Sequence, residues 1–408
     1  MKLATKQFEQ KMFEFGKKPN TQQLTANLAD QVSVALQKSL SGAGATAYKA
    51  FLESYNPQER VIDANGQKLG LKMVSPKTFL SPFGKITVHR RLYQADAGGA
   101  GCVPLDHLWD MDGHFATVQV REAICLSMAH MTAGETEQLF KKCTLFQPSA
   151  TAIKHIVEKV GEQISHHKEQ IVQQISTKQS VPGGTRVPVA SMDGANVLLR
   201  EPGSCQRRPV ERPSKQDGAD KHASYKNAMV GSFSFFTKIP IKIRTALNVL
   251  AAIIQLKCRK IEQLDLKGDF EQQLEFVEGK ITDKVPKILL FDGARGLWRY
   301  AENTDRFNDY EKLIDFYHTR EHLSKAERRF FRCNTHRTYY TPFCRRGFPI
   351  GSGPVEAACK SIVKTRLCRS GMRWSRPGGQ HVLVLRCYAK SGLWDEFWET
   401  YKHVRQSA

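Results

Sequence analysis

Two short apolar segments of this chain each run directly into an Asp-Gly pair. They cover residues 187–192 and 287–291, and their aspartates are Asp193 and Asp292. Apolar runs of this length that end in a turn signal are typical of buried strands. A third segment, residues 349–356, has the pattern of a helix start and carries Glu356. We therefore expect a mixed α/β core in which two strand ends and a helix start meet.

These three carboxylates have two interpretations. Each has a local explanation, because Asp-Gly is a favoured turn pair and Glu356 would be the third residue of a helix capped at Gly353 with Pro354 first. The functional interpretation is a metal site, because Mg²⁺ takes oxygen ligands and glycine lets a ligand approach the backbone closely. Three carboxylates on two strand ends and a helix are what two-metal phosphoryl transfer requires.

The charge of the chain favours the functional interpretation. The sequence has 408 residues with 61 Lys and Arg against 40 Asp and Glu, a net charge of +21. Such an excess favours a polyanionic partner, most commonly nucleic acid, although a basic solvated surface would have the same composition. Cations and an aromatic side chain follow Glu356, and we predict that they contact DNA: Lys360, Lys364, Arg366, Arg369, Arg373 and Trp374.

The ten cysteines contain no Cys-x-x-Cys pair, so no zinc ribbon is expected. Their scattered positions suit a reducing cytoplasm. The N-terminus has no apolar signal-peptide segment, and no stretch is long enough to span a membrane. His318 and His322 are four residues apart, but no third ligand is evident and a zinc site is not predicted.

Composition changes along the chain predict four regions. Residues 1–60 read as amphipathic helices, with one helix opened near residues 20–21 and ended by the glycines at 42–45. Residues 61–114 carry two hairpin signals. Residues 115–180 are helical and contain either a helix-turn-helix reader of DNA or a plain helical bundle. The break at residues 181–184 opens a catalytic region that extends to residue 408, with the segment 311–317 as a further strand.

Several runs in the last region resemble the DDE transposases of bacterial insertion sequences, particularly the ISKra family. The resemblance covers about residues 185–400, and the runs around Glu356 and Trp374 are its most specific parts. The matching runs are 192–194, 200–203, 291–294 with Trp298, 315–318 with 321–323, 349–353 with 355–360, and 369–374.

The resemblance implies an RNase H-like catalytic core, a mixed sheet flanked by helices, preceded by a mainly helical DNA-binding region. Asp193, Asp292 and Glu356 match the metal-binding triad of such enzymes. Asp315 and His318 match a supporting Asp-x-x-His signature on the strand before a helical insertion, which here is short and covers about residues 319–348.

The function implied is cleavage and strand transfer of element ends by two Mg²⁺ ions, for which Mn²⁺ could substitute. The implied partners are double-stranded DNA, both the inverted ends and the target, and further copies of the chain in a synaptic complex. The implied location is the bacterial cytoplasm, at the nucleoid. Two alternatives stay open: a degenerate or repurposed DNA-binding relative without turnover, and an RNase H-like nuclease without strand transfer.

Overall fold

The computed structural model describes residues 26–64, 66–143, 146–200, 223–236, 243–254, 265–281, 284–325 and 328–406, together with Lys6 and Gln10. The chain divides into two compact units, residues 1–160 and 161–407. The sequence places a boundary near residue 181, whereas the structural division falls within a helix, α6. Among the described residues, no helix is both long and apolar enough to cross a membrane.

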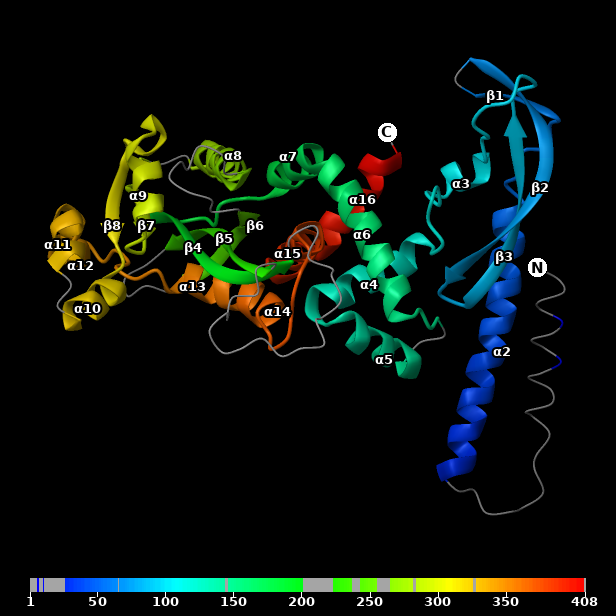
Figure 1. The fold of residues 1–408 in the computed structure, drawn as a ribbon, viewed down its shortest axis with the longest axis horizontal. Helices are drawn as coiled ribbons and strands as arrows, with labels where there is room; N and C mark the ends of the chain where they lie inside the picture. Colours follow the sequence, from blue (N-terminus) through cyan, green and yellow to red (C-terminus); the bar gives the residue numbers. More distant parts are fainter. Residues whose placement is uncertain are drawn as a thin grey trace, which may run out of the picture. The chain divides into compact units, whose positions relative to one another are not determined.

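The first unit combines a long helix, a three-stranded sheet and a group of helices (Figure 1). Its sheet is an antiparallel meander, so both predicted hairpins are confirmed. The elements are α2 (Ala26–Glu53), β1 (Val61–Ala64), β2 (Gln67–Ser81), β3 (Gly84–Gln94), α3 (Pro104–Leu108), α4 (Val118–His130), α5 (Ala133–Cys143) and α6 (Ala150–His166), the last of which extends into the second unit.

The glycines at 42–45 do not end the first helix, and that prediction is wrong. Helix α2 continues through them to Glu53. A Cβ at Gly44 would meet the ring of Phe83 at 2.5 Å, so a glycine here lets the β2–β3 turn approach the helix. The predicted start near residues 20–21 lies outside the described residues. Within the region predicted to be helical, residues 115–180, α6 ends at His166 and a separate helix, α7 (Lys168–Lys178), follows it.

The second unit is built on a five-stranded mixed sheet flanked by helices (Figure 1). Its strand order is β6-β5-β4-β7-β8, with β4, β5 and β6 antiparallel and β4, β7 and β8 parallel. The strands are β4 (Val187–Arg200), β5 (Ala223–Phe236), β6 (Ile243–Ile254), β7 (Lys287–Phe291) and β8 (Tyr310–Ile314). The α/β class expected from the sequence is confirmed.

The helices of this unit follow the strands in three groups. Helices α8 (Asp265–Gly279) and α9 (Arg295–Glu302) flank β7 in the sequence. Helices α10 (Phe316–Ser324), α11 (Arg328–Asn334) and α12 (Tyr340–Arg345) cover the segment expected to be a short insertion. The C-terminal group is α13 (Gly353–Cys359), a π-helical turn (Lys360–Lys364), α14 (Thr365–Leu367), α15 (Arg376–Lys390) and α16 (Trp394–Gln406).

Side chains of β4, β7 and β8 cover both faces of the sheet, and they alternate along these strands as strand geometry requires. Met192 and Phe291 belong to a core cluster with residues of α8 and α9. Val189, Ile288 and Leu313 belong to a second cluster with Phe343 of α12. The candidate site lies on the face of the sheet that this second cluster covers.

Candidate active site on three parallel strands

Asp193 and Asp292 lie beside each other on neighbouring strands. Val189 of β4 pairs with Ile288 of β7, an offset of 99 positions, and the same offset separates Asp193 from Asp292. Asp292 directly follows β7, as predicted. Asp193 lies inside β4, not at a strand end, because β4 stays paired with β5 as far as Arg200.

Asp315 directly follows the third strand, β8, and forms a row with Asp193 and Asp292. Phe291 of β7 pairs with Ile314 of β8, an offset of 23 positions that also separates Asp292 from Asp315. Strand alternation places all three aspartates on the face of Val189, Ile288 and Leu313. Neighbouring strands are about 4.8 Å apart, so the row brings three carboxylates together.

The carboxylate of Asp193 is half-buried next to a thiol. Its Oδ1 accepts a hydrogen bond from the Gly194 N–H at 2.6 Å. Burial raises the pKa of Asp193 and the charge of Asp292 adds to this rise, while Gly194, the Cys359 thiol and Lys364 act in the opposite direction. Burial also raises the pKa of Cys359 to about 12, so this thiol stays protonated and donates to the carboxylate.

Asp292 is the electrostatic centre of the site. Its Oδ1 accepts a hydrogen bond from the Ala294 N–H at 2.9 Å. Burial raises the pKa of Asp292, and the Ala294 N–H and the charge of His318 lower it. The charges of Asp315 and Glu356 raise it further. Like charges that raise the pKa of Asp292 lie close to it, and a cation between them would relieve the repulsion.

Asp315 is fully buried and joins two helix starts. The strand predicted over 311–317 ends at Ile314, and Asp315 is the N-cap of α10, with its Oδ1 accepting from the His318 N–H at 2.7 Å. Its Oδ2 accepts from the backbone N–H of Ser352, the N-cap of α13. His318 therefore lies in a helix and not on the preceding strand, which corrects the expectation from the sequence.

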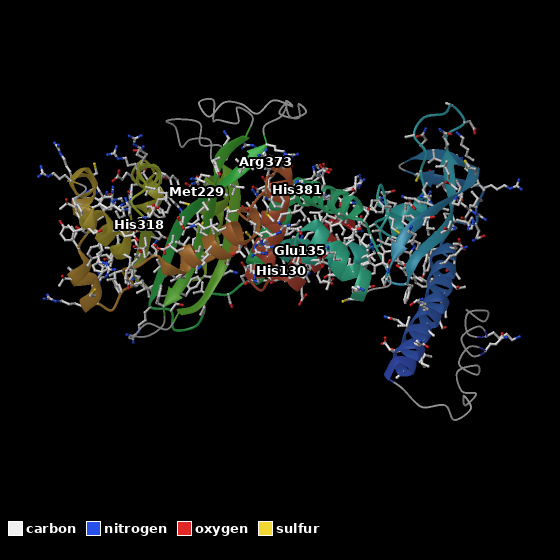
Figure 2. All side chains as sticks on the ribbon, turned by 60° about the horizontal axis from the view of Figure 1, so that its bottom comes forward. His130, Glu135, Met229, His318, Arg373 and His381 are labelled. Carbon is white, nitrogen blue, oxygen red and sulfur yellow. The ribbon has the colours of Figure 1, made fainter. Side chains whose placement is uncertain are left out.

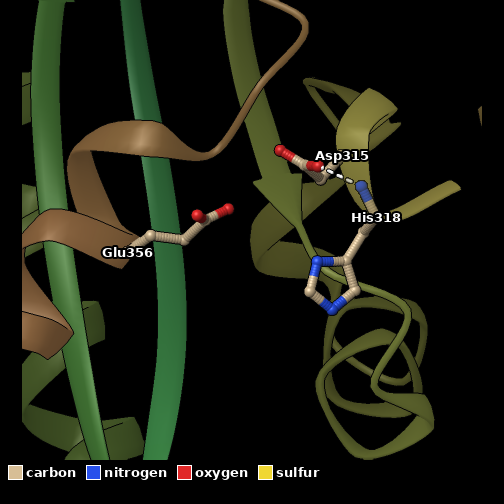
Figure 3. A group of neighbouring side chains, drawn as sticks. All are labelled: Asp315, His318 and Glu356. Atoms are coloured by element: carbon tan, nitrogen blue, oxygen red, sulfur yellow. Dashed lines mark hydrogen bonds between the residues drawn. The ribbon is translucent and has the colours of Figure 1, made fainter. Parts of the chain in front are cut away.

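Glu356 reaches the aspartate row from α13. The helix is capped at Ser352 and not at Gly353, so Glu356 is its fourth residue, and the Ser352 hydroxyl donates to Glu356 Oε1 at 2.6 Å. One ligand atom from each of Asp315, His318 and Glu356 lies within 4.8 Å of the others. Figure 3 shows the Glu356 side chain extending from its helix toward the other two.

The donor set fits a hard divalent cation. Carboxylate oxygens predominate, as Mg²⁺ requires, and the imidazole of His318 is a ligand that Mn²⁺ also accepts. The oxygens of Asp193, Asp292 and Glu356 would hold such ions. Both Asp315 oxygens already accept backbone N–H groups, so this residue has a structural role as well as any ligand role.

The basic residues behind Glu356 differ in their exposure. Lys360, Lys364, Arg369 and Arg373 are exposed, as a surface that contacts DNA requires. Arg366 is 1% exposed and its guanidinium lies 4.9 Å from the centre of the Trp374 ring. Arg366 therefore does not lie at the surface in this structure, and its contact with DNA stays a prediction.

Trp374 is also bound to the sheet. Its backbone N–H donates to the carbonyl of Leu198 and its indole N–H to the carbonyl of Leu367. Trp374 is half-buried, so a role in base stacking stays a prediction. Figure 2 shows Arg373 apart from His318, with Met229 of β5 drawn between them.

Four residues with a clear place in this site were not assigned a role from the sequence. Ser352 contacts Glu356, and Cys359 contacts Asp193. Trp298 donates its indole N–H to the Asp292 carbonyl, and Arg337 lies over the Trp298 ring. Ser352, Cys359 and Trp298 lie in runs that carry the family resemblance, which was the available signal. Nothing in the local sequence of Arg337 indicates its contact.

No known protein family and no curated protein matches the chain. Three matches among solved structures are transposase complexes. The Drosophila P element transposase strand transfer complex has 12% identity and a TM-score of 0.27, over 69% of this chain and 80% of that chain. A pre-cleavage Mos1 transpososome has 9% identity and a TM-score of 0.20, over 66% and 74%. The Mos1 strand transfer complex has 10% identity and a TM-score of 0.14, over 70% and 77%.

Proposed function

We propose that the chain is a metal-dependent DNA transposase with an RNase H-like core, related to those of bacterial insertion sequences. One observation carries this proposal: the carboxylates of Asp193, Asp292, Asp315 and Glu356 gather on one face of a mixed sheet. The sheet is flanked by helices and followed by a short helical insertion, in agreement with the resemblance.

In this proposal Asp193, Asp292 and Glu356 hold two Mg²⁺ ions, for which Mn²⁺ can substitute. When bound, such ions activate the attacking oxygen and stabilise the leaving oxygen of an in-line phosphoryl transfer. The chain's own groups prepare the site. Gly194 and Ala294 orient the two aspartates through backbone N–H groups, and Ser352 orients Glu356.

The buried Asp315 fixes the geometry between the sheet and the glutamate. It accepts from the N–H groups that open α10 and α13, so movement of one helix start would disturb the other. Orientation of this kind is a large part of catalysis in phosphoryl transfer, because there is little covalent chemistry for the protein to perform.

The proposed substrate is double-stranded DNA, with the ends of the element bound first and target DNA afterwards. The support is the net charge of +21 and the exposed cations behind Glu356, of which Lys364 also acts on Asp193. Two element ends must be held together, so we expect a homo-oligomer in a synaptic complex, located in the bacterial cytoplasm.

The test is cleavage of DNA that carries the ends of the encoding element, with Mg²⁺ present or absent. The informative variant is Asp292→Asn, which keeps the side-chain oxygen that Ala294 contacts and removes the charge. Asp395→Asn is the matched control, since Asp395 is an exposed aspartate in the first turn of α16, outside the site.

Metal-dependent cleavage that Asp292→Asn abolishes and Asp395→Asn preserves is the expected result. DNA binding without cleavage by the unmodified protein would contradict the enzyme assignment and favour the degenerate relative. Cleavage without joining of the ends to target DNA would favour the nuclease. Cleavage that survives in Asp292→Asn would contradict the site.

A further inference from the structure

The backbone of the loop that carries Asp292 is hydrogen-bonded to an indole ring. Trp298 of α9 donates its indole N–H to the backbone carbonyl of Asp292 at 2.7 Å. The Asp292 carboxylate is fixed separately through the Ala294 N–H at 2.9 Å. Together these two hydrogen bonds set both the peptide plane and the side chain of the aspartate, and so determine where its oxygens point.

Trp298 is itself held by the insertion. It is 3% exposed, and the guanidinium of Arg337 lies 4.1 Å from the centre of its ring. Arg337 is 5% exposed and donates to Asn334 Oδ1 at 2.8 Å and to Glu302 Oε1. A guanidinium that is fixed on both edges can keep an indole ring in one orientation, and buried cation–π pairs of this kind are stabilising.

A second contact from the insertion covers the same loop. A Cβ at Gly293 would meet the ring of Phe330 at 2.2 Å, so α11 lies against the backbone immediately after Asp292. Phe330 in turn stacks on His322 of α10, with ring centres 4.0 Å apart. The insertion therefore contacts the Asp292 loop through two independent side chains, Arg337 by way of Trp298 and Phe330 directly.

We propose that Trp298, clamped by Arg337, is a positioning residue for Asp292, and that the short insertion is thereby part of the metal centre. This inference rests on the proposed function, because it assigns the role of these residues through the metal that Asp292 would hold. Residues that orient a ligand typically change metal affinity by about 10- to 100-fold when they are lost.

The test compares two tryptophan-to-phenylalanine changes in the full-length protein. Trp298→Phe keeps an aromatic ring over Arg337 and removes the N–H that contacts Asp292. Trp398→Phe is the matched control, because Trp398 is 1% exposed and its indole nitrogen has no hydrogen-bond partner among the described residues. Binding of Mn²⁺ alone, measured by electron paramagnetic resonance, gives the affinity, and thermal unfolding gives the stability.

We expect Trp298→Phe to weaken Mn²⁺ binding by about tenfold, while Trp398→Phe lowers the unfolding temperature without changing the affinity. Arg337→Lys keeps the charge but loses the planar stack, and we expect a loss of about threefold. Cleavage by Trp298→Phe should recover when Mn²⁺ is raised by the same factor, which a general loss of folded protein would not produce.

Equal Mn²⁺ affinity in Trp298→Phe and the unmodified protein would overturn the positioning role and leave the proposed function intact. Equal weakening by Trp298→Phe and Trp398→Phe would also overturn it, because the effect would then follow from core packing. The proposed function fails separately if Asp292→Asn binds Mn²⁺ as tightly as the unmodified protein, and the positioning role would fail with it.

Discussion

Replacing Asp292 with asparagine should make the metal-free protein more stable at neutral pH while removing its activity. The carboxylate is placed where burial and the charges of Asp315 and Glu356 raise its pKa. Asparagine has nearly the same shape and keeps the oxygen that accepts from the Ala294 N–H. The substitution therefore removes the repulsion and leaves the local hydrogen bond in place.

The magnitude follows from the spacing of the strands. Two unit charges about 4.8 Å apart repel each other by about 3 kcal/mol at an effective dielectric constant near 20, and by about 1 kcal/mol in water. Glu356 is exposed and His318 attracts the Asp292 charge, so the lower figure applies. A gain of about 1 kcal/mol raises the unfolding temperature of a unit of this size by about 2–4 °C.

Thermal unfolding in the presence of a chelator and then of Mn²⁺ measures this effect. Without metal, we expect Asp292→Asn to unfold at a higher temperature than the unmodified protein. With Mn²⁺, the unmodified protein should gain stability by mass action and the variant should gain little, so the difference narrows or reverses. A variant that is less stable in chelator, or that gains as much from Mn²⁺, would refute the reasoning.

Three further predictions concern neighbouring features. Gly351→Ala should lower the free energy of unfolding by about 1 kcal/mol at most, because its Cβ would meet the ring of Tyr317 at 2.9 Å and this exposed ring can move aside. Gly353→Ala, with nothing within 4 Å, should have little effect. Lys364→Ala should weaken DNA binding and reduce its salt dependence by about one unit of slope, whereas Arg366→Ala should lower stability because Arg366 is buried. Because the pKa of Asp193 is raised above 3.8, the folded state binds more protons than the unfolded state between pH 3.8 and the raised pKa. The free energy of unfolding of the chelator-treated protein should therefore fall as the pH rises through that window. The fall should be smaller for Asp193→Asn, which has no carboxylate to titrate at this position.

The local sequence located the carboxylates of the candidate site more reliably than it predicted the backbone conformation around them. Apolar runs located β4 and β7, and Asp-Gly pairs located two of the carboxylates. The same pairs wrongly predicted a turn at Asp193, because strand pairing with β5 outweighs the turn preference of Asp-Gly at that position. A local preference worth a few tenths of a kcal/mol is easily overridden by a ladder of hydrogen bonds that runs the length of the strand.

The contacts that complete the site are long-range, and local patterns do not predict them. Asp315 joins Ser352 across 37 positions, and Arg337 lies on Trp298 from a separate helix. Arg366 is a second case in which the local pattern does not predict the contact. A cation in a basic run is expected at the surface, but Arg366 is buried against Trp374. Such burial depends on which face of a helix meets the sheet, which the run of charges does not specify.

The proposed function places the metal ions on Asp193, Asp292 and Glu356, and diffraction from Mn²⁺-soaked crystals tests this most directly. The account predicts anomalous density within coordination distance of Asp292, with oxygens of Asp193 or Glu356 completing each ion. That density should disappear from crystals of Asp292→Asn. Ordered Mn²⁺ elsewhere, or density that survives in Asp292→Asn, would contradict the claim.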